Sequence, residues 1–139
     1  MLSADTCRLL REALAKMRSP VRLVCFTGTA AGEAGTRAVR LARDMASLSD
    51  RIAVEERDLG RDREAAAACR IDRAPAIVVV GDRDRGIRFT GAPGGHEIMA
   101  LADAILLASA GDSGLSPASR VRLARLKTPL DIQVFVTPT

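Results

Sequence analysis

The segment VRLVCFTGTAAGEAGTRAVRLA, residues 21–42, holds the strongest indication of the fold. The nearly continuous apolar run from Val21 to Phe26 predicts a buried strand. From Thr36 onward, apolar residues recur at the spacing of an amphipathic helix. Gly32 and Gly35 lie between them, three residues apart, in a glycine-rich elbow. The segment therefore predicts a strand, an elbow and a helix in direct succession, and it raises the question of which chemistry the elbow carries.

The composition limits the class of protein. A chain of 139 residues fits one domain, and 47% hydrophobic residues are enough for a core. Aromatic residues are only 2%, so Leu, Val, Ile and Ala must fill that core. The net charge of +4 is mild, and the lack of aromatic stacking platforms argues against nucleic-acid binding. No apolar run approaches the roughly 20 residues of a membrane span. The N-terminus does not resemble a signal peptide, so we expect a cytoplasmic protein.

Further elements follow from the same reading of apolar spacing and turn residues. Helices are predicted over residues 4–18, 33–47, 62–70, from Gly94-Gly95 onward, and 117–127; strands are predicted over 21–26, 52–58, 77–80, 86–90 and 132–136. Strands that alternate with helices indicate an α/β protein, and the hairpin at 77–90 adds antiparallel pairing.

The order of these elements is that of the thioredoxin-like fold. It reads βαβαββα, with a mixed central sheet flanked by helices, an extra N-terminal helix and a C-terminal helix–strand extension. We expect residues 1–110 to form the thioredoxin-like domain. Residues 111–139 are expected to hold a linker, a basic helix and the truncated start of a second repeat unit.

The chain has three cysteines, Cys7, Cys25 and Cys69, and they form no CxxC pair and no Cys/His metal cluster. We expect no metal and no cofactor. In a cytoplasm these thiols are reduced. Cys25 lies inside the first strand, where a buried thiol is inert. Cys69 ends the short helix at 62–70, and its expected partial exposure makes it a possible redox thiol.

Several separate segments resemble one family. They are FTG after the first strand, CRIDRAPA at residues 69–76, and GIRFTGAPGGHE at residues 86–97. Together they resemble the N-terminal half of the glutaredoxin-like protein disulfide oxidoreductases, which contain two tandem thioredoxin folds. The resemblance runs over nearly the whole chain and in the same order.

The resemblance places a redox CxxC motif on the elbow. Thiol chemistry needs this position because a helix N-terminus lowers the pKa of a cysteine. The sequence here is GEAG, with Gly32 and Gly35 at the positions that match the two cysteines. No thiolate forms at a glycine, so the disulfide exchange that the family carries out at this elbow is expected to be absent.

The resemblance also implies a cis proline beside the elbow, at Pro75. In the family, the residue before it offers backbone hydrogen bonds to an extended substrate. Thr27, Glu33, Ala74 and Pro75 are therefore the candidates for docking a peptide or a partner. A role of this turn in folding alone is the preferred explanation of the proline.

The last residues, DIQVFVTPT at 131–139, resemble the first strand and its continuation. The relatives carry a second unit here, with a second CxxC soon after. If no such unit covers the basic helix and the strand at 132–136, their apolar side chains need another cover, since exposed strand edges pair with other chains. The sequence therefore predicts a homodimer or a protein partner that binds through the C-terminal helix–strand segment.

Three functions remain open. The leading hypothesis is a redox-inactive thioredoxin-like protein that serves as a structural or protein-interaction module. The first alternative is a thiol-disulfide oxidoreductase of cell redox homeostasis, acting through Cys69 or the missing unit. The second is an anion or nucleotide binder at the elbow, supported by Arg37, Arg40 and Arg43. The glycines there match neither GxGxxG nor the P-loop.

Overall fold

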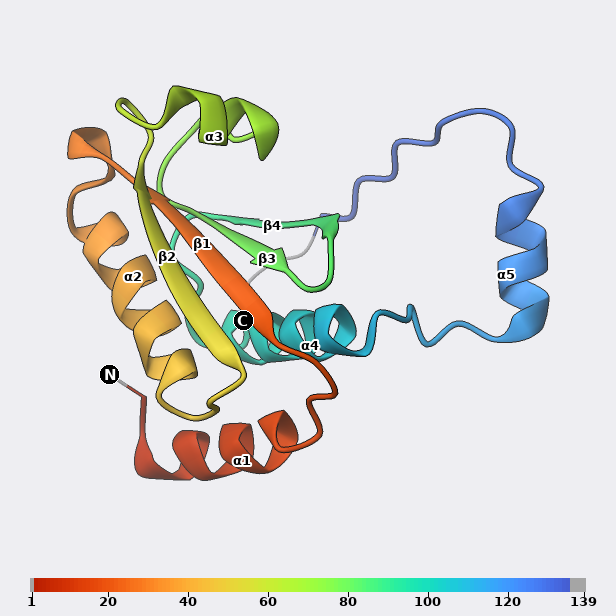
Figure 1. Ribbon diagram of the computed structural model, residues 1–139, viewed down its shortest axis with the longest axis horizontal. Helices are drawn as coiled ribbons and strands as arrows, with labels where there is room; N and C mark the ends of the chain where they lie inside the picture. The colour runs from red at the N-terminus through yellow and green to blue at the C-terminus, as the bar shows by residue number, and fades with distance from the viewer. Residues whose placement is uncertain (1, 136–139) are drawn as a thin grey trace.

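The computed structural model describes residues 2–135, which fold around one central sheet (Figure 1). The elements in chain order are α1 (Ala4–Leu14), β1 (Val21–Thr27), the 3-10 turn η1 (Thr29–Ala31), α2 (Gly32–Ala46), β2 (Ile52–Asp58), α3 (Arg63–Ala68), β3 (Ala76–Val80), β4 (Asp84–Thr90), α4 (Glu97–Ala110) and α5 (Pro117–Ala124).

The sheet is mixed, with strand order β2-β1-β3-β4. β1 runs parallel to β2 and antiparallel to β3, and β3 and β4 form an antiparallel hairpin with a bulge between Val79 and Val80. β1 is central and pairs on both sides, so its nearly continuous apolar sequence is explained by burial on both faces. The predicted α/β class and βαβαββα order are confirmed.

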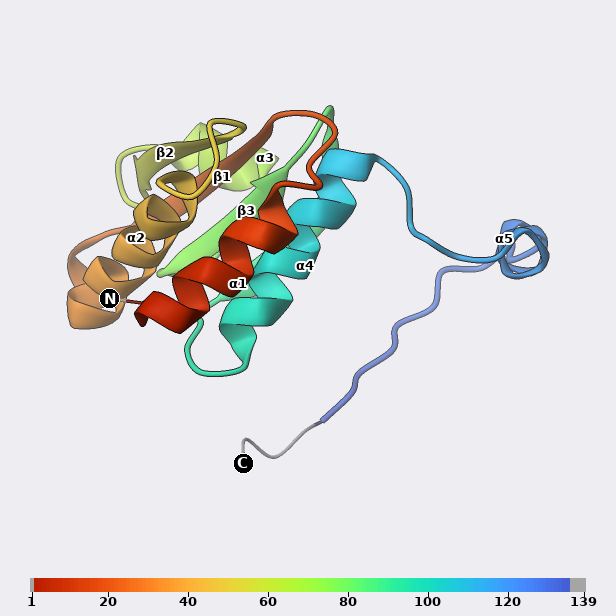
Figure 2. The same cartoon turned by 90° about the horizontal axis from the view of Figure 1, so that it is seen from below.

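The helices cover the two faces of the sheet unequally (Figures 1 and 2). Alternate side chains of β1 point to opposite faces: Leu23 and Cys25 join the larger core with α1, α2 and α4, whereas Val24 and Phe26 join a smaller core under α3. The larger core is almost entirely aliphatic, as the composition predicts. Because α3 has only six residues, it covers its face of the sheet only in part.

Two helices are shorter than the sequence predicts. α1 ends at Leu14 rather than at residue 18, because the chain tightens there into bonds from Lys16 N to Ala13 O at 3.1 Å and from Met17 N to Leu14 O at 3.0 Å. α3 ends at Ala68, and the chain then turns through Arg70 in the left-handed region, with φ of 54°. Within residues 2–135, no helix combines the length and apolar character that a membrane span needs.

The C-terminal extension differs from its prediction. α5 ends at Ala124 rather than at residue 127, none of its residues is buried, and it stands away from the sheet (Figure 1). The strand predicted at 132–136 is wrong over residues 132–135, which form no strand. The pattern predicted a strand, but a strand also needs a partner for its backbone groups, and none lies beside this segment in the described part of the chain. Val136 lies outside the described residues.

Candidate functional site

The elbow between β1 and α2 is built on the backbone of Gly32. This residue has φ of 51° and ψ of −137°, a conformation that residues with a Cβ rarely adopt. The three residues of η1 lead into it, and α2 begins at the same glycine. A cysteine at this position would therefore be strained, although space is open around it.

Gly35 lies in the first turn of α2 and is buried. A Cβ atom at this position would lie 2.8 Å from the Cβ of Ala31 and 3.7 Å from Cγ2 of Thr27. Contacts under 3.0 Å are essentially never found between real Cβ atoms. Neither position accepts a side chain without strain or movement: Gly32 has a positive φ, and a Cβ at position 35 meets the methyl group of Ala31.

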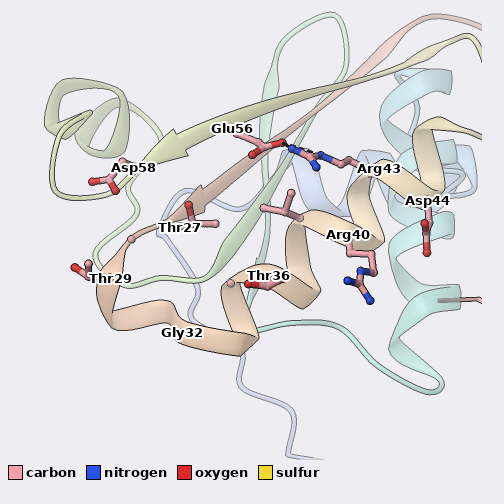
Figure 3. A pocket seen from close by; sticks show the side chains of 12 residues that line it. Thr27, Thr29, Gly32, Thr36, Arg40, Arg43, Asp44, Glu56 and Asp58 are labelled. Carbon is pink, nitrogen blue, oxygen red and sulfur yellow. Dashed lines mark hydrogen bonds and ion pairs between the residues drawn. The ribbon is translucent and has the colours of Figure 1, made fainter.

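A cavity of about 580 Å³ opens beside the elbow (Figure 3). Its charged lining consists of Arg40, Arg43, Asp44, Glu56 and Asp58. Arg43 is already occupied, because its Nε donates to Oε1 of Glu56 at 2.9 Å. Two arginines thus face three carboxylates, and this charge balance does not favour an anion or a nucleotide here.

A second hollow, of about 520 Å³, lies on the other side of the same loop. Its lining comes from the loop at 28–30, from residues 58–60 and from the turn at 72–74, with the charged side chains of Arg63, Asp72 and Arg73 among them. The Ala74–Pro75 peptide bond is cis, and the carbonyl of Pro75 accepts a hydrogen bond from Gly91 N at 2.8 Å. The loop after β1 and the cis-proline turn therefore meet at one end of the sheet.

The four candidate docking residues are not all brought together. Thr27 lines the first cavity and Ala74 the second, while Pro75 is buried in the turn behind it. Glu33 lines neither cavity; its side chain is 97% exposed and lies 3.8 Å from Arg37 in an i,i+4 ion pair. The structure thus places Thr27 and Ala74 on the two sides of one loop and leaves Glu33 in solvent.

Cys25 is completely buried under α2. Burial, together with the smaller effect of Glu56, raises the pKa of its thiol to about 12, while Arg43 acts in the opposite direction. A thiol with this pKa is neutral and unreactive at physiological pH. The expectation that Cys25 is buried is confirmed.

Cys69 lies on the opposite face of the sheet from the elbow. It follows the last turn of α3 and packs, half-buried, against the smaller core of Val24 and Phe26. α2 covers the other face, so no geometry brings Cys69 to Gly32 or Gly35. All three cysteines are free, and no cluster of metal-ligating side chains occurs between residues 2 and 135.

Comparison with known proteins identifies the fold. No protein-family model matches the sequence, and no curated protein is significantly similar to it. The solved structure of a protein disulfide oxidoreductase from Aeropyrum pernix k1 is 28% identical, with a TM-score of 0.79 over 91% of this chain and 56% of that one.

Two more distant structures agree. The NTD_N/C domain of the alkylhydroperoxide reductase AhpF from Enterococcus faecalis is 20% identical, with a TM-score of 0.76 over 88% of this chain and 60% of that one. Fasciola hepatica thioredoxin is 22% identical, with a TM-score of 0.51 over 73% of this chain. The chain has a thioredoxin-like fold, like that of protein disulfide oxidoreductases and of the N-terminal AhpF domain. It spans less than two thirds of the length of the first two proteins.

Some residues of the site could not be found from the sequence. The methyl group of Ala31 lies close to position 35 because η1 turns it toward α2. The local sequence TAAGEAG does not indicate that contact. Arg43 and Glu56 meet only because α2 packs beside β2. The parallel pairing of β1 with β2 was predictable, but the side-chain partners across it were not.

Proposed function

We propose that this chain is a redox-inactive thioredoxin-fold module that serves as a structural or protein-interaction unit. The observation that carries the proposal is the elbow itself. The two positions that match the family's cysteines are glycines, one at a positive φ and one filled by the methyl group of Ala31. Disulfide exchange at this place needs a thiolate in front of the helix, where its dipole stabilises the charge.

The remaining thiols do not replace the missing pair. Cys25 has a raised pKa and no exposure, and Cys69 lies across the sheet. A thiol becomes a good nucleophile through an electropositive and accessible environment, and burial has the opposite effect. The chain therefore has the thioredoxin-like fold but no reactive cysteine at the elbow.

Two surfaces of the chain are consistent with a role in protein interaction. The hollow between the loop at 28–30 and Ala74 lies where thioredoxin-like relatives dock extended peptides, and it is free of bulky side chains on the loop. The C-terminal segment adds a row of exposed apolar side chains; they are Val121, Leu123, Leu126, Leu130, Ile132, Val134 and Phe135. We place a protein partner or a second copy of the chain on this segment.

The test is insulin reduction with dithiothreitol as the electron donor. We expect the full chain to reduce insulin no faster than a cysteine-free variant that carries Cys7→Ser, Cys25→Ala and Cys69→Ser. Turnover clearly above that variant would refute a redox-inactive function. Circular dichroism of both proteins confirms that each is folded.

A thiol-disulfide oxidoreductase is the second candidate function. It is supported by the 28% identity to a protein disulfide oxidoreductase and by the partial exposure of Cys69. In the same assay, activity that disappears in Cys69→Ser and persists in Cys7→Ser would establish this candidate. Cys7 is the matched control because it is also half-buried and free.

A further inference from the structure

Arginines gather at the edge of the sheet beside α3, although Arg85 directs its Nη2 toward Gly111 at the end of α4. They surround a cavity of about 600 Å³ between the end of α3 and the β3–β4 hairpin, together with one carboxylate; the charged lining is Arg70, Arg83, Asp84, Arg85 and Arg88. Figure 2 shows that α3 lies behind the sheet, away from α1 and α4. The cavity is therefore separate from the elbow.

Arg88 and Asp84 line this cavity as an ion pair, so their charges cancel. Arg88 Nη1 donates to Oδ1 of Asp84 at 2.8 Å, and Nη2 donates to the other carboxylate oxygen. Its Nε donates to the carbonyl of Cys69 at 2.8 Å, so the side chain is only 19% exposed and joins β4 to the end of α3. The hydrogen bonds from Arg88 lower the pKa of Asp84, which stays ionised.

The other positive charges are less compensated. Arg85 Nη2 donates to Oδ1 of the exposed Asp82 at 2.9 Å. Arg70 and Arg83 form no ion pair within 4.0 Å among residues 2–135. With Asp84 paired to Arg88 and Asp82 paired to Arg85, Arg70 and Arg83 are the arginines of this lining that have no salt-bridge partner among residues 2–135.

Arg70 occupies a position where glycine is the usual residue. The end of α3 closes with bonds from Arg70 N to Ala67 O at 3.0 Å and from Ile71 N to Ala66 O at 2.8 Å, the pattern of a Schellman turn. Arg70 has φ of 54° there, which strains any residue with a Cβ. Strain of this kind persists where a side chain serves a function, and an arginine in this place projects its charge at the cavity.

We propose that this cavity binds a phosphate dianion, either free or as the monoester group of a small molecule. Two uncompensated guanidinium groups match the double charge, and each can donate two hydrogen bonds to phosphate oxygens. The volume lies within the range of small-molecule sites. The site is independent of the function proposed above, because it lies on the other face of the sheet and involves no thiol.

Isothermal titration of the full chain with inorganic phosphate, and separately with glycerol 3-phosphate, tests the site at constant ionic strength. We expect saturable binding of at least one of the two, and the tighter one identifies the free ion or the ester as the ligand. Arg83→Ala should weaken binding about tenfold or more, as the loss of a charged hydrogen-bond partner does. Arg11→Ala, on α1 at the other face, should bind like the wild type.

Arg70→Gly gives the sharpest result, because stability and binding should change in opposite directions. Without ligand its Tm should rise by about 2–5 °C, since glycine relieves the strain at positive φ. Its phosphate binding should fall about tenfold or more. Absence of saturable binding up to about 10 mM, or unchanged binding in Arg70→Gly, overturns the proposal. Loss of binding in Arg40→Ala but not in Arg70→Gly also overturns it, because the anion would then sit at the elbow.

Discussion

The methyl group of Ala31 limits what position 35 can hold. A Cβ at position 35 would lie 2.8 Å from the Cβ of Ala31, so any side chain there requires the residues around it to move. Gly35 is therefore part of the packing of the elbow.

We expect Gly35→Ala to destabilise the protein. Overpacking costs about 1–3 kcal/mol, and the higher helix propensity of alanine offsets about 1 kcal/mol of it. Ala31→Gly removes the opposing methyl group, so the double variant Ala31→Gly/Gly35→Ala should lose less stability than the sum of the single variants. Urea denaturation of the four proteins measures this coupling. Additive effects would show that the two positions do not compete for space.

Cys25 predicts a loss of stability at alkaline pH. Its folded-state pKa of about 12 lies above the ordinary value of 9.0. The unfolded chain therefore binds fewer protons than the folded chain between these values, and stability falls as the pH rises. The contribution is complete below pH 9 and decreases by about 1.4 kcal/mol per pH unit above it.

Urea denaturation at several pH values between 8 and about 10.5 measures this slope. In Cys25→Ala the slope should be shallower, although the variant starts from a lower stability. Cys7→Ala serves as the control, and the chain contains no tyrosine to add its own titration. An identical slope in Cys25→Ala and the wild type would contradict the raised pKa.

At the scale of elements, one serine joins α4 to the turn before β1. Ser109 is 3% exposed, and its Oγ accepts hydrogen bonds from Arg18 N at 2.8 Å and Ser19 N at 2.9 Å while donating to Ser19 O at 2.7 Å. Ser19 Oγ in turn donates to the carbonyl of Ser109 at 2.6 Å. These bonds fix the turn at Arg18 and Ser19 against α4, just before the central strand begins at Val21.

Ser109→Ala should therefore lower the free energy of unfolding by about 2–3 kcal/mol, because two backbone donors lose their partner in a part-buried place. Chemical denaturation measures the loss. Ser113→Ala, in the exposed loop after α4, is the matched control and should change stability by less than about 0.5 kcal/mol. Equal effects of the two substitutions would contradict the role of Ser109.

At the scale of the whole molecule, the chain divides into a packed part and an exposed part. Among residues 2–135, every buried residue lies at or before Ser109, whereas Ile132 and Phe135 are 78% and 89% exposed. Arg120 holds α5 only to its own loop, through Leu115 O at 2.9 Å and the carboxylate of Asp112. Apolar side chains that are exposed in a row are typical of an interaction surface.

A chain shortened to residues 1–112 should keep its Tm within about 2 °C, because no residue from 113 to 135 is buried. Light scattering should show that the full chain gains apparent mass with concentration and that the shortened chain stays monomeric. A large fall in Tm would mean that residues 113–139 belong to the folding unit. A full chain that is monomeric at high micromolar concentration and captures no partner would argue against docking through this segment.

The sequence alone determined the four strands of the sheet, the buried faces of α2 and α4, and the absence of a CxxC pair. Apolar spacing depends on local geometry, so the runs at 21–26 and 77–80 indicated buried strands without knowledge of their neighbours. The aliphatic core and the inert Cys25 followed from the same patterns. These features reflect each residue's preference for water or for the interior.

Tertiary structure alone decided the features that depend on two distant segments. The methyl group of Ala31 beside position 35, Ser109 against the turn at 18–19, and the lining of one cavity by Arg70 and Arg83 are arrangements that no local pattern encodes. For the same reason the strand predicted at 132–136 does not form over its described residues: a strand is stable only when another chain segment accepts its hydrogen bonds.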